Sequence, residues 1–176
     1  MIVVGVLGMD DGLAAEIAGR AAAAGARTEI VGLAPADPVG DRVILQLAEA
    51  GIGHATVTRS AAGGIEAVDL ALALRYLPDV RAIMLVGPTA SLLAPAVAAA
   101  SWSGATLVVV GPLDADAISL LQAAPDALVF EPPADDPDRS FPGLLVALAL
   151  RLEAGETIDA AWRATLMPLS VDPLRY

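Results

Sequence analysis

Short apolar segments alternate with alanine-rich segments along the chain, and this alternation constrains the fold more than any other feature. Several of these segments are strongly apolar, and glycine or proline often closes the helix-like stretch that follows each one. Uninterrupted apolar runs are typical of parallel strands that are buried on both faces of a sheet. The pattern therefore predicts an α/β fold: a three-layer α/β/α sandwich with a mostly parallel, doubly wound, Rossmann-like sheet of about six strands.

The expected elements follow from these runs and their turn signals. The expected strands cover residues 2–7, 28–33, 55–58, 82–86, 106–110 and 128–130. The expected helices cover residues 13–24, 39–50, 65–77, 90–102, 114–123, 141–152 and 157–166. Pro95 falls inside one of these helices, where proline is tolerated only near the first turn. We expect residues 1–167 to form a single domain and residues 168–176 to form an irregular C-terminal tail.

Composition excludes several classes of function. The 176 residues carry a formal net charge of −11, which argues against nucleic acid as a partner because a nucleic-acid-binding surface is basic. The chain has no lysine, so mechanisms that need a lysine are excluded. Cysteine is absent, which excludes thiolate nucleophiles, disulfides and cysteine-ligated metals.

The uncharged stretch of residues 82–113 is longer than the ~18 residues that a membrane helix needs. Glycine and proline interrupt it at several points, including Gly87-Pro88 and Gly111-Pro112. These interruptions predict a strand, a helix and a second strand rather than one membrane-spanning helix. We therefore expect a cytoplasmic protein that does not associate with a membrane.

Residues 131–143 follow the last expected strand and precede a long apolar helix. In parallel α/β sheets, ligands bind beyond the carboxyl ends of the strands, often at a helix N-terminus. Asp135, Asp136 and Asp138 suit Mg²⁺ or Ca²⁺, although the prolines among them favour a solvated acidic loop. Ser140 is the expected cap of the helix.

Other polar residues have both a functional and a structural interpretation. Acidic residues after the first two strands suit a ligand site or helix N-termini, where carboxylates are favourable; they are Asp10, Asp11, Glu16, Asp37 and Asp41. His54 is the one histidine available as a general base, and a structural role is favoured for it. Trp102 and Trp162 are expected to pack on helices rather than to stack on a ligand.

Several pieces of sequence, in order, resemble the ribokinase or PfkB family of carbohydrate kinases. The pieces are Gly5 with Asp10; Asp11-Gly12, Glu16 and Gly25-Ala26; Gly32; Asp37-Pro-Val-Gly40-Asp41; residues 47–57; Phe141-Pro-Gly143; and Gly155. The resemblance implies a ribokinase-like fold and ligand contacts from Asp10, Asp11, Gly12, Glu16, Asp37, Gly40 and Asp41.

The chain departs from this family where its catalysis takes place. Active members carry Gly-Ala-Gly-Asp before the matching phenylalanine, and its amides hold the transferred phosphoryl group while its aspartate is the base. Here the residues are Asp136, Pro137, Asp138 and Arg139. Proline has no amide hydrogen, the carboxylates repel phosphate, and arginine cannot accept a proton at neutral pH. A slip of one residue would put Asp138 at the base position but would not restore the glycines.

Further departures point the same way. Residues 131–133 stand where the family has its magnesium-binding element, and little chain is left for a sugar-covering lid or for the strands that hold adenine. We therefore predict a truncated, degenerate relative with no catalytic residue and no cofactor. It would be a small-molecule-binding or scaffolding protein.

Two alternatives to this prediction stay open. One is a minimal sugar or nucleoside kinase that uses ATP and Mg²⁺ with Asp10, Asp37 and Asp138. The other is a nucleotide-binding sensor without chemistry. For the leading prediction we expect a homodimer that associates through the helix over residues 90–102, to be tested with Val97→Arg or Leu93→Asp, or through the helix over residues 65–77.

Overall fold

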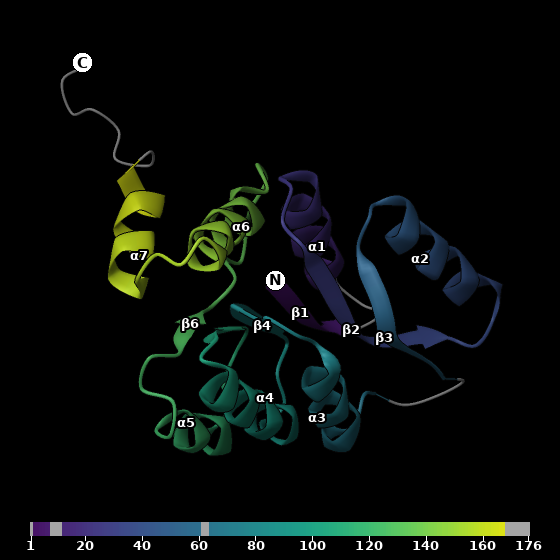
Figure 1. Ribbon diagram of the computed structural model, residues 1–176, viewed down its shortest axis with the longest axis horizontal. Helices are drawn as coiled ribbons and strands as arrows, with labels where there is room; N and C mark the ends of the chain where they lie inside the picture. The colour runs from purple at the N-terminus through teal and green to yellow at the C-terminus, as the bar shows by residue number, and fades with distance from the viewer. Residues whose placement is uncertain (1, 8–11, 61–63, 168–176) are drawn as a thin grey trace.

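Six parallel strands form one sheet between two layers of helices (Figure 1) in the computed structural model, which describes residues 2–7, 12–60 and 64–167. The strands are β1 (Ile2–Leu7), β2 (Thr28–Pro35), β3 (Gly53–Ser60), β4 (Ala82–Val86), β5 (Thr106–Val110) and β6 (Leu128–Phe130). The helices are α1 (Leu13–Ala23), α2 (Pro38–Glu49), α3 (Ala67–Tyr76), α4 (Ala90–Ser103), α5 (Ala115–Leu121), α6 (Ser140–Glu153) and α7 (Ile158–Leu166).

The strand order β3-β2-β1-β4-β5-β6 makes the sheet doubly wound. From β1 the chain moves outward to β2 and β3, returns through α3 to β4 beside β1, and then moves outward the other way. Residue 2 pairs with Ala82 and residue 5 with Leu85 where the two halves meet. Because all the pairings are parallel, the carboxyl ends of the strands share one edge, with the topological switch point between β1 and β4.

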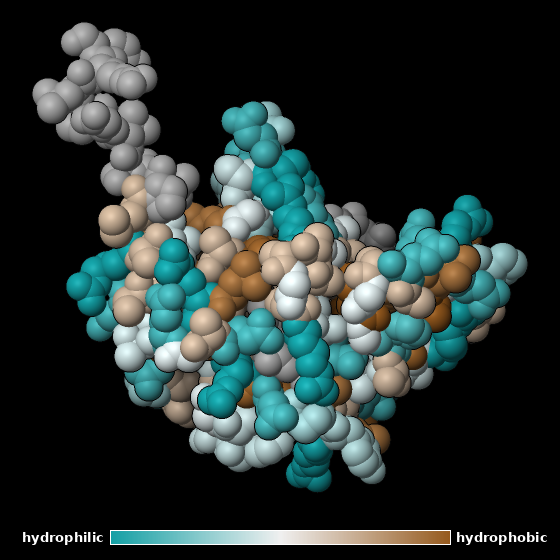
Figure 2. Space-filling view, turned by 45° about the horizontal axis from the view of Figure 1, so that its top comes forward, coloured by the Kyte–Doolittle hydropathy of each residue, from teal (hydrophilic) through white to brown (hydrophobic). Residues whose placement is uncertain are grey.

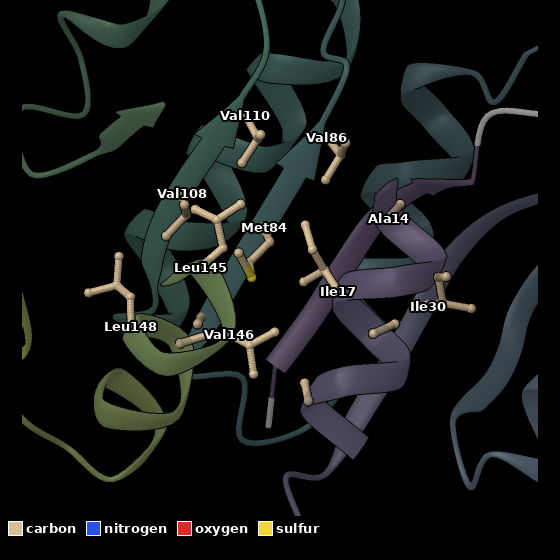
Figure 3. Packing of buried hydrophobic residues seen from close by; sticks show 14 of the residues in the cluster. Ala14, Ile17, Ile30, Met84, Val86, Val108, Val110, Leu145, Val146 and Leu148 are labelled. Carbon is tan, nitrogen blue, oxygen red and sulfur yellow. The ribbon is translucent and has the colours of Figure 1, made fainter. Parts of the chain in front are cut away.

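One face of the sheet is covered by α1, α2, α6 and α7, as the upper layer in Figure 1 shows. Alternate residues of the strands point to this face, because successive side chains of a strand face opposite sides. Figure 3 shows Met84 and Val108 of the sheet facing Leu145 of α6 and Ile17 of α1. These side chains are almost completely buried.

The opposite face is covered by α3, α4 and α5. The other set of strand residues, including Ile83, Leu85 and Val109, packs there against Leu74 of α3 and Leu93 of α4. Aliphatic side chains thus fill both sides of the central strands. This double burial explains why these strands are continuous apolar runs in the sequence.

The sequence-based bounds of β1, β4, β5 and β6 are confirmed, whereas β2 and β3 are longer than expected. Among the described strands, β3 lies at the edge of the sheet and pairs only with β2. Polar residues such as His54, Thr56 and Thr58 alternate along it. An edge strand needs fewer apolar residues, and its ends were therefore not visible as part of an apolar run.

Two details complete the fold. Pro95 is the sixth residue of α4 and lies in its second turn, so the expectation that proline must fall near the first turn is wrong. Among the described residues, no helix is both long enough and apolar enough to cross a membrane. Residues 168–176, the expected tail, lie outside the described part of the chain.

Candidate functional site

The candidate site lies at the switch point between β1 and β4. Helix α1 begins just after β1, and α6 packs against α1 and over β1 and β4. The acidic segment that precedes α6 therefore reaches the edge where a ligand of a parallel α/β protein would bind. Asp10 and Asp11, two of the predicted ligand residues, lie outside the described residues.

Asp136 caps the N-terminus of α6. Its Oδ1 atom accepts hydrogen bonds from the Ser140 amide and the Ser140 hydroxyl, both at 2.9 Å, and its Oδ2 atom accepts one from the Phe141 amide at 3.1 Å. These amides begin the helix and have no partner inside it. The prediction that Ser140 is the cap is wrong, because Ser140 is the first helical residue and donates to Asp136.

The surroundings of Asp136 favour its ionised form. Desolvation by burial acts to raise its pKa, but the Ser140 hydroxyl, the Phe141 and Ser140 amides and the charge of Arg20 outweigh it. The pKa of Asp136 is therefore below its usual value, because each of these groups stabilises the carboxylate. A negative charge that belongs to the protein thus occupies the place where a helix N-terminus binds an anion.

Glu16 and Arg139 meet across this site although they are 123 residues apart in the chain. Arg139 Nε lies 3.3 Å from Glu16 Oε1, and Arg139 Nη2 pairs with Glu16 Oε2. Glu16 also pairs with Arg20 one turn further along α1, at 2.8 Å. Glu16, one of the predicted ligand residues, is therefore part of an ionic link between α1 and the start of α6.

Arg139 is held in a left-handed backbone conformation, with φ of 50° and ψ of 39°. Its amide donates to the Asp136 carbonyl at 3.1 Å, which closes the turn before the helix. A non-glycine residue in this conformation costs about 1–2 kcal/mol. The turn and the pair with Glu16 hold the Arg139 guanidinium in place, and Asp138 beside it is exposed.

The second group of predicted ligand residues, after β2, has structural roles. Asp37 Oδ1 accepts from the Val39 and Gly40 amides at 2.8 and 3.0 Å and so caps α2. Asp41 pairs with Arg59 of β3 at 2.8 Å. Gly40 is buried, and a Cβ atom at this position would collide with the Pro35 carbonyl. These contacts favour the structural interpretation of this group.

The remaining candidates also have local explanations. Gly12 has φ of 60° at the N-cap of α1, a conformation that glycine adopts without strain. His54 Nδ1 lies 3.0 Å from the Ile52 carbonyl oxygen. The Trp162 ring lies 5.4 Å from that of Phe130, and Trp102 is exposed at the end of α4. Within residues 12–60 and 64–167, no three histidine, aspartate or glutamate side chains are grouped to hold a metal ion.

A groove between α1 and α2 was not predicted from the sequence. It has a volume of about 360 Å³ and opens on the layer that Figure 2 turns toward the viewer, where apolar surface is exposed between polar ridges. Its walls are mostly apolar or small and include Gly12, Ala15, Gly19, Leu33, Val43 and Leu47. The groove could not be predicted from the sequence, because alanine and glycine occur equally well on a packed or on an exposed helix face.

Comparison with known proteins gives matches by structure only. No protein-family model matches the chain, and no curated protein matches its sequence. A PfkB protein from Polaromonas sp. JS666 is similar with a TM-score of 0.59 and 12% identity, over 85% of this chain and 81% of that chain. The fold is ribokinase-like.

Two further solved structures have the same fold. A putative ribokinase II from E. coli is similar with a TM-score of 0.61 and 11% identity, over 94% of this chain and 90% of that chain. Aminoimidazole riboside kinase from Salmonella enterica is similar with a TM-score of 0.62 and 9% identity, over 94% and 89%. The fold that the sequence resemblance implied is therefore confirmed.

Proposed function

We propose that this ribokinase-like protein is catalytically inactive and acts as a small-molecule-binding or scaffolding homo-oligomer. The observation that carries the proposal is the Asp136 carboxylate on the first amides of α6. In a ribokinase-like kinase those amides would face the transferred phosphoryl group. Phosphoryl transfer depends on stabilising negative charge, and a resident carboxylate there opposes it.

The charge network around the loop supports the same proposal. Arg139, at the position of the family base, pairs with Glu16 and cannot accept a proton at neutral pH. The small-molecule part of the proposal is supported by the groove between α1 and α2, because concave, mostly apolar sites suit small ligands. This groove does not involve residues 131–143.

A turnover assay tests the inactivity. The purified chain is incubated with ATP, Mg²⁺ and a panel of sugars and nucleosides, and ADP release is expected to equal the protein-free blank. Turnover that is abolished by Asp138→Asn would instead establish a minimal kinase that uses ATP and Mg²⁺. Stabilisation of several degrees by adenine nucleotides, without turnover, would indicate a nucleotide sensor.

A gain-of-binding variant tests the physical reason directly. Replacement of residues 136–139 by Gly-Ala-Gly-Asp removes the resident carboxylate from the start of α6. We expect inorganic phosphate to raise the melting temperature of this variant but not that of the unaltered protein, because only the variant has free amides there. Equal effects of phosphate on both proteins would contradict the proposed blocking role of Asp136.

A further inference from the structure

Helix α3 carries an apolar stripe on its solvent side. Val68, Leu72 and Tyr76, here called the α3 stripe, are 65%, 53% and 76% exposed. They are spaced by four residues and therefore lie on one face of the helix. The opposite face, with Leu70 and Leu74, is almost completely buried against the sheet and α4. The stripe is thus additional to the core packing of α3.

Two charged residues flank the stripe symmetrically. Asp69 comes three residues before Leu72 and Arg75 three residues after it, and both are exposed. At 100° per residue, they project on opposite sides of the stripe. The face is therefore apolar along its centre, negative on one side and positive on the other. Among the described residues, Arg75 forms no ion pair.

We propose that the α3 stripe is the contact surface for a second copy of this chain, with a two-fold axis running along the stripe. This symmetry places each stripe residue opposite the same residue of the other copy. It also places Asp69 of each copy opposite Arg75 of the other, on both sides of the stripe. The face is then complementary to itself in shape and in charge, as a two-fold interface requires.

The charges select this arrangement over the other two-fold arrangement. An axis across the stripe would pair Val68 with Tyr76 but would oppose Asp69 with Asp69 and Arg75 with Arg75. Like charges that face each other across an interface are unfavourable. Helices that pack along ridges of residues four apart cross at roughly 50°, the commonest packing of helices, so the stripe geometry is an ordinary one.

The position of α3 leaves room for this contact. Figure 1 shows α3 beside α4 at the end of the lower layer, away from the candidate site on the opposite side of the sheet. Five residues are fewer than the roughly 20–30 per side of a standard interface, so the dimer is weak and depends on concentration. This inference deepens the self-association part of the proposed function and names its surface. The turnover assay tests inactivity separately.

Sedimentation velocity between about 10 μM and about 1 mM tests the association, because a weak interface populates a dimer in this range. The unaltered chain is expected to shift from monomer to dimer, and Leu72→Glu to weaken the dimer at least tenfold. Leu45→Glu is the matched control, since Leu45 on α2 is 57% exposed and Leu72 53%. A chain that stays monomeric, or equal effects of both substitutions, would overturn the proposal.

Single cysteines test the symmetry, because the natural chain has none. Val68→Cys and Tyr76→Cys are each treated with a short bismaleimide. With the axis along the stripe, each variant cross-links to itself, whereas Leu45→Cys on α2 does not. If only a mixture of the two variants cross-links, the axis lies across the stripe and the proposed symmetry is wrong.

Charge reversal tests the flanking pairs. Arg75→Glu is expected to weaken the dimer at least fivefold, because Asp69 would then face a carboxylate. Addition of Asp69→Lys is expected to restore association. Since Asp69 also accepts from the Glu66 amide at 3.4 Å, the melting temperature of each variant is measured alongside. Failure of the double variant to recover, with its fold intact, would contradict the pairing.

Discussion

Two carboxylates have opposite effects on the stability of the folded protein. The ionised side chain of Asp136 is stabilising, whereas that of Glu29 is destabilising. The hydrogen bonds of Asp136 to the first amides of α6 are stronger while it is ionised, because a carboxylate is a better acceptor than a neutral carboxyl group. Its folded pKa is below its unfolded value, so the stabilisation is present above the unfolded pKa and is lost as the pH falls through the folded pKa. The α6 cap is therefore a feature of neutral rather than acidic conditions.

We expect Asp136→Ala to lower the melting temperature by a few degrees at pH 7, because two helix amides lose their acceptor. The difference from the unaltered protein should shrink below about pH 4, where the unfolded carboxyl is protonated. Thermal unfolding followed by circular dichroism measures both effects. Asp138→Ala, at an exposed position in the same loop, is the control and should leave the melting temperature unchanged.

Glu29 on β2 is the unfavourable case. Desolvation by burial raises its pKa, although the charges of Arg27 and His54 act in the opposite direction. Its Oε2 atom is inaccessible to solvent and has no hydrogen-bond partner in the described part of the chain. A folded pKa above the unfolded value means that stability from this group is fully present below the unfolded pKa and is lost as the pH rises through the folded pKa.

We therefore expect Glu29→Gln to raise the melting temperature at pH 8, because the substitution removes a buried charge. Below about pH 4, where the glutamate is protonated in both states, the two proteins should melt together. Melting curves across this pH range check the prediction. Glu49→Gln, at an exposed site on α2, should change nothing, and a Glu29→Gln protein that melts lower at pH 8 would contradict it.

Among the elements, α4 lacks one of the backbone hydrogen bonds that a regular helix has. Pro95 has no amide hydrogen, so the Ser91 carbonyl lacks its usual partner in the second turn of the helix. The helix continues to Ser103 because Leu93, Ala96 and Ala100 are buried on its inner face. Tertiary packing thus maintains a helix that local preference would break.

Pro95→Ala should raise the free energy of unfolding by about 1–2 kcal/mol. Replacement of an interior proline by alanine favours the helix by up to roughly 3 kcal/mol, and the greater freedom of the unfolded chain offsets part of that gain. Urea unfolding measures the change. A lower free energy of unfolding would mean that the proline ring itself is needed for packing.

At the scale of the whole molecule, one sheet divides the interior into two cores that cannot form separately. Met84 and Leu85 are neighbours on β4, yet Met84 packs under α1 and α6, and Leu85 packs over α3 and α4. Loss of either core exposes the same strands. We therefore expect the domain to unfold in a single cooperative transition.

Met84→Ala tests this coupling. It should lower the free energy of unfolding by about 2–5 kcal/mol, the usual range for deletion of a fully buried large side chain. Probes on both sides of the sheet should still report one transition. Val129→Ala on β6 is the comparison, because Val129 is 47% exposed and its loss should stay within about 0.5 kcal/mol. Separate transitions for the two layers would contradict a shared core.

The sequence by itself determined the features that depend on neighbouring residues. Apolar runs specified the buried strands, and glycine and proline specified the ends of most helices. The choice of Asp37 as a helix cap needed no tertiary information either, because its side chain reaches amides only two and three residues away. These interactions are local, and the residue types that make them are restricted by backbone geometry.

Only the tertiary structure decided the features that depend on distant or ambiguous residues. Glu16 and Arg139 meet because α1 and α6 pack together, and no spacing in the sequence predicts a contact over 123 residues. The α3 stripe could not be predicted from the sequence, because α3 has apolar residues on both faces. Its exposed face can be identified only after the opposite face has been placed against the sheet. The physical reason is that packing, rather than local preference, selects which face of an apolar helix is buried.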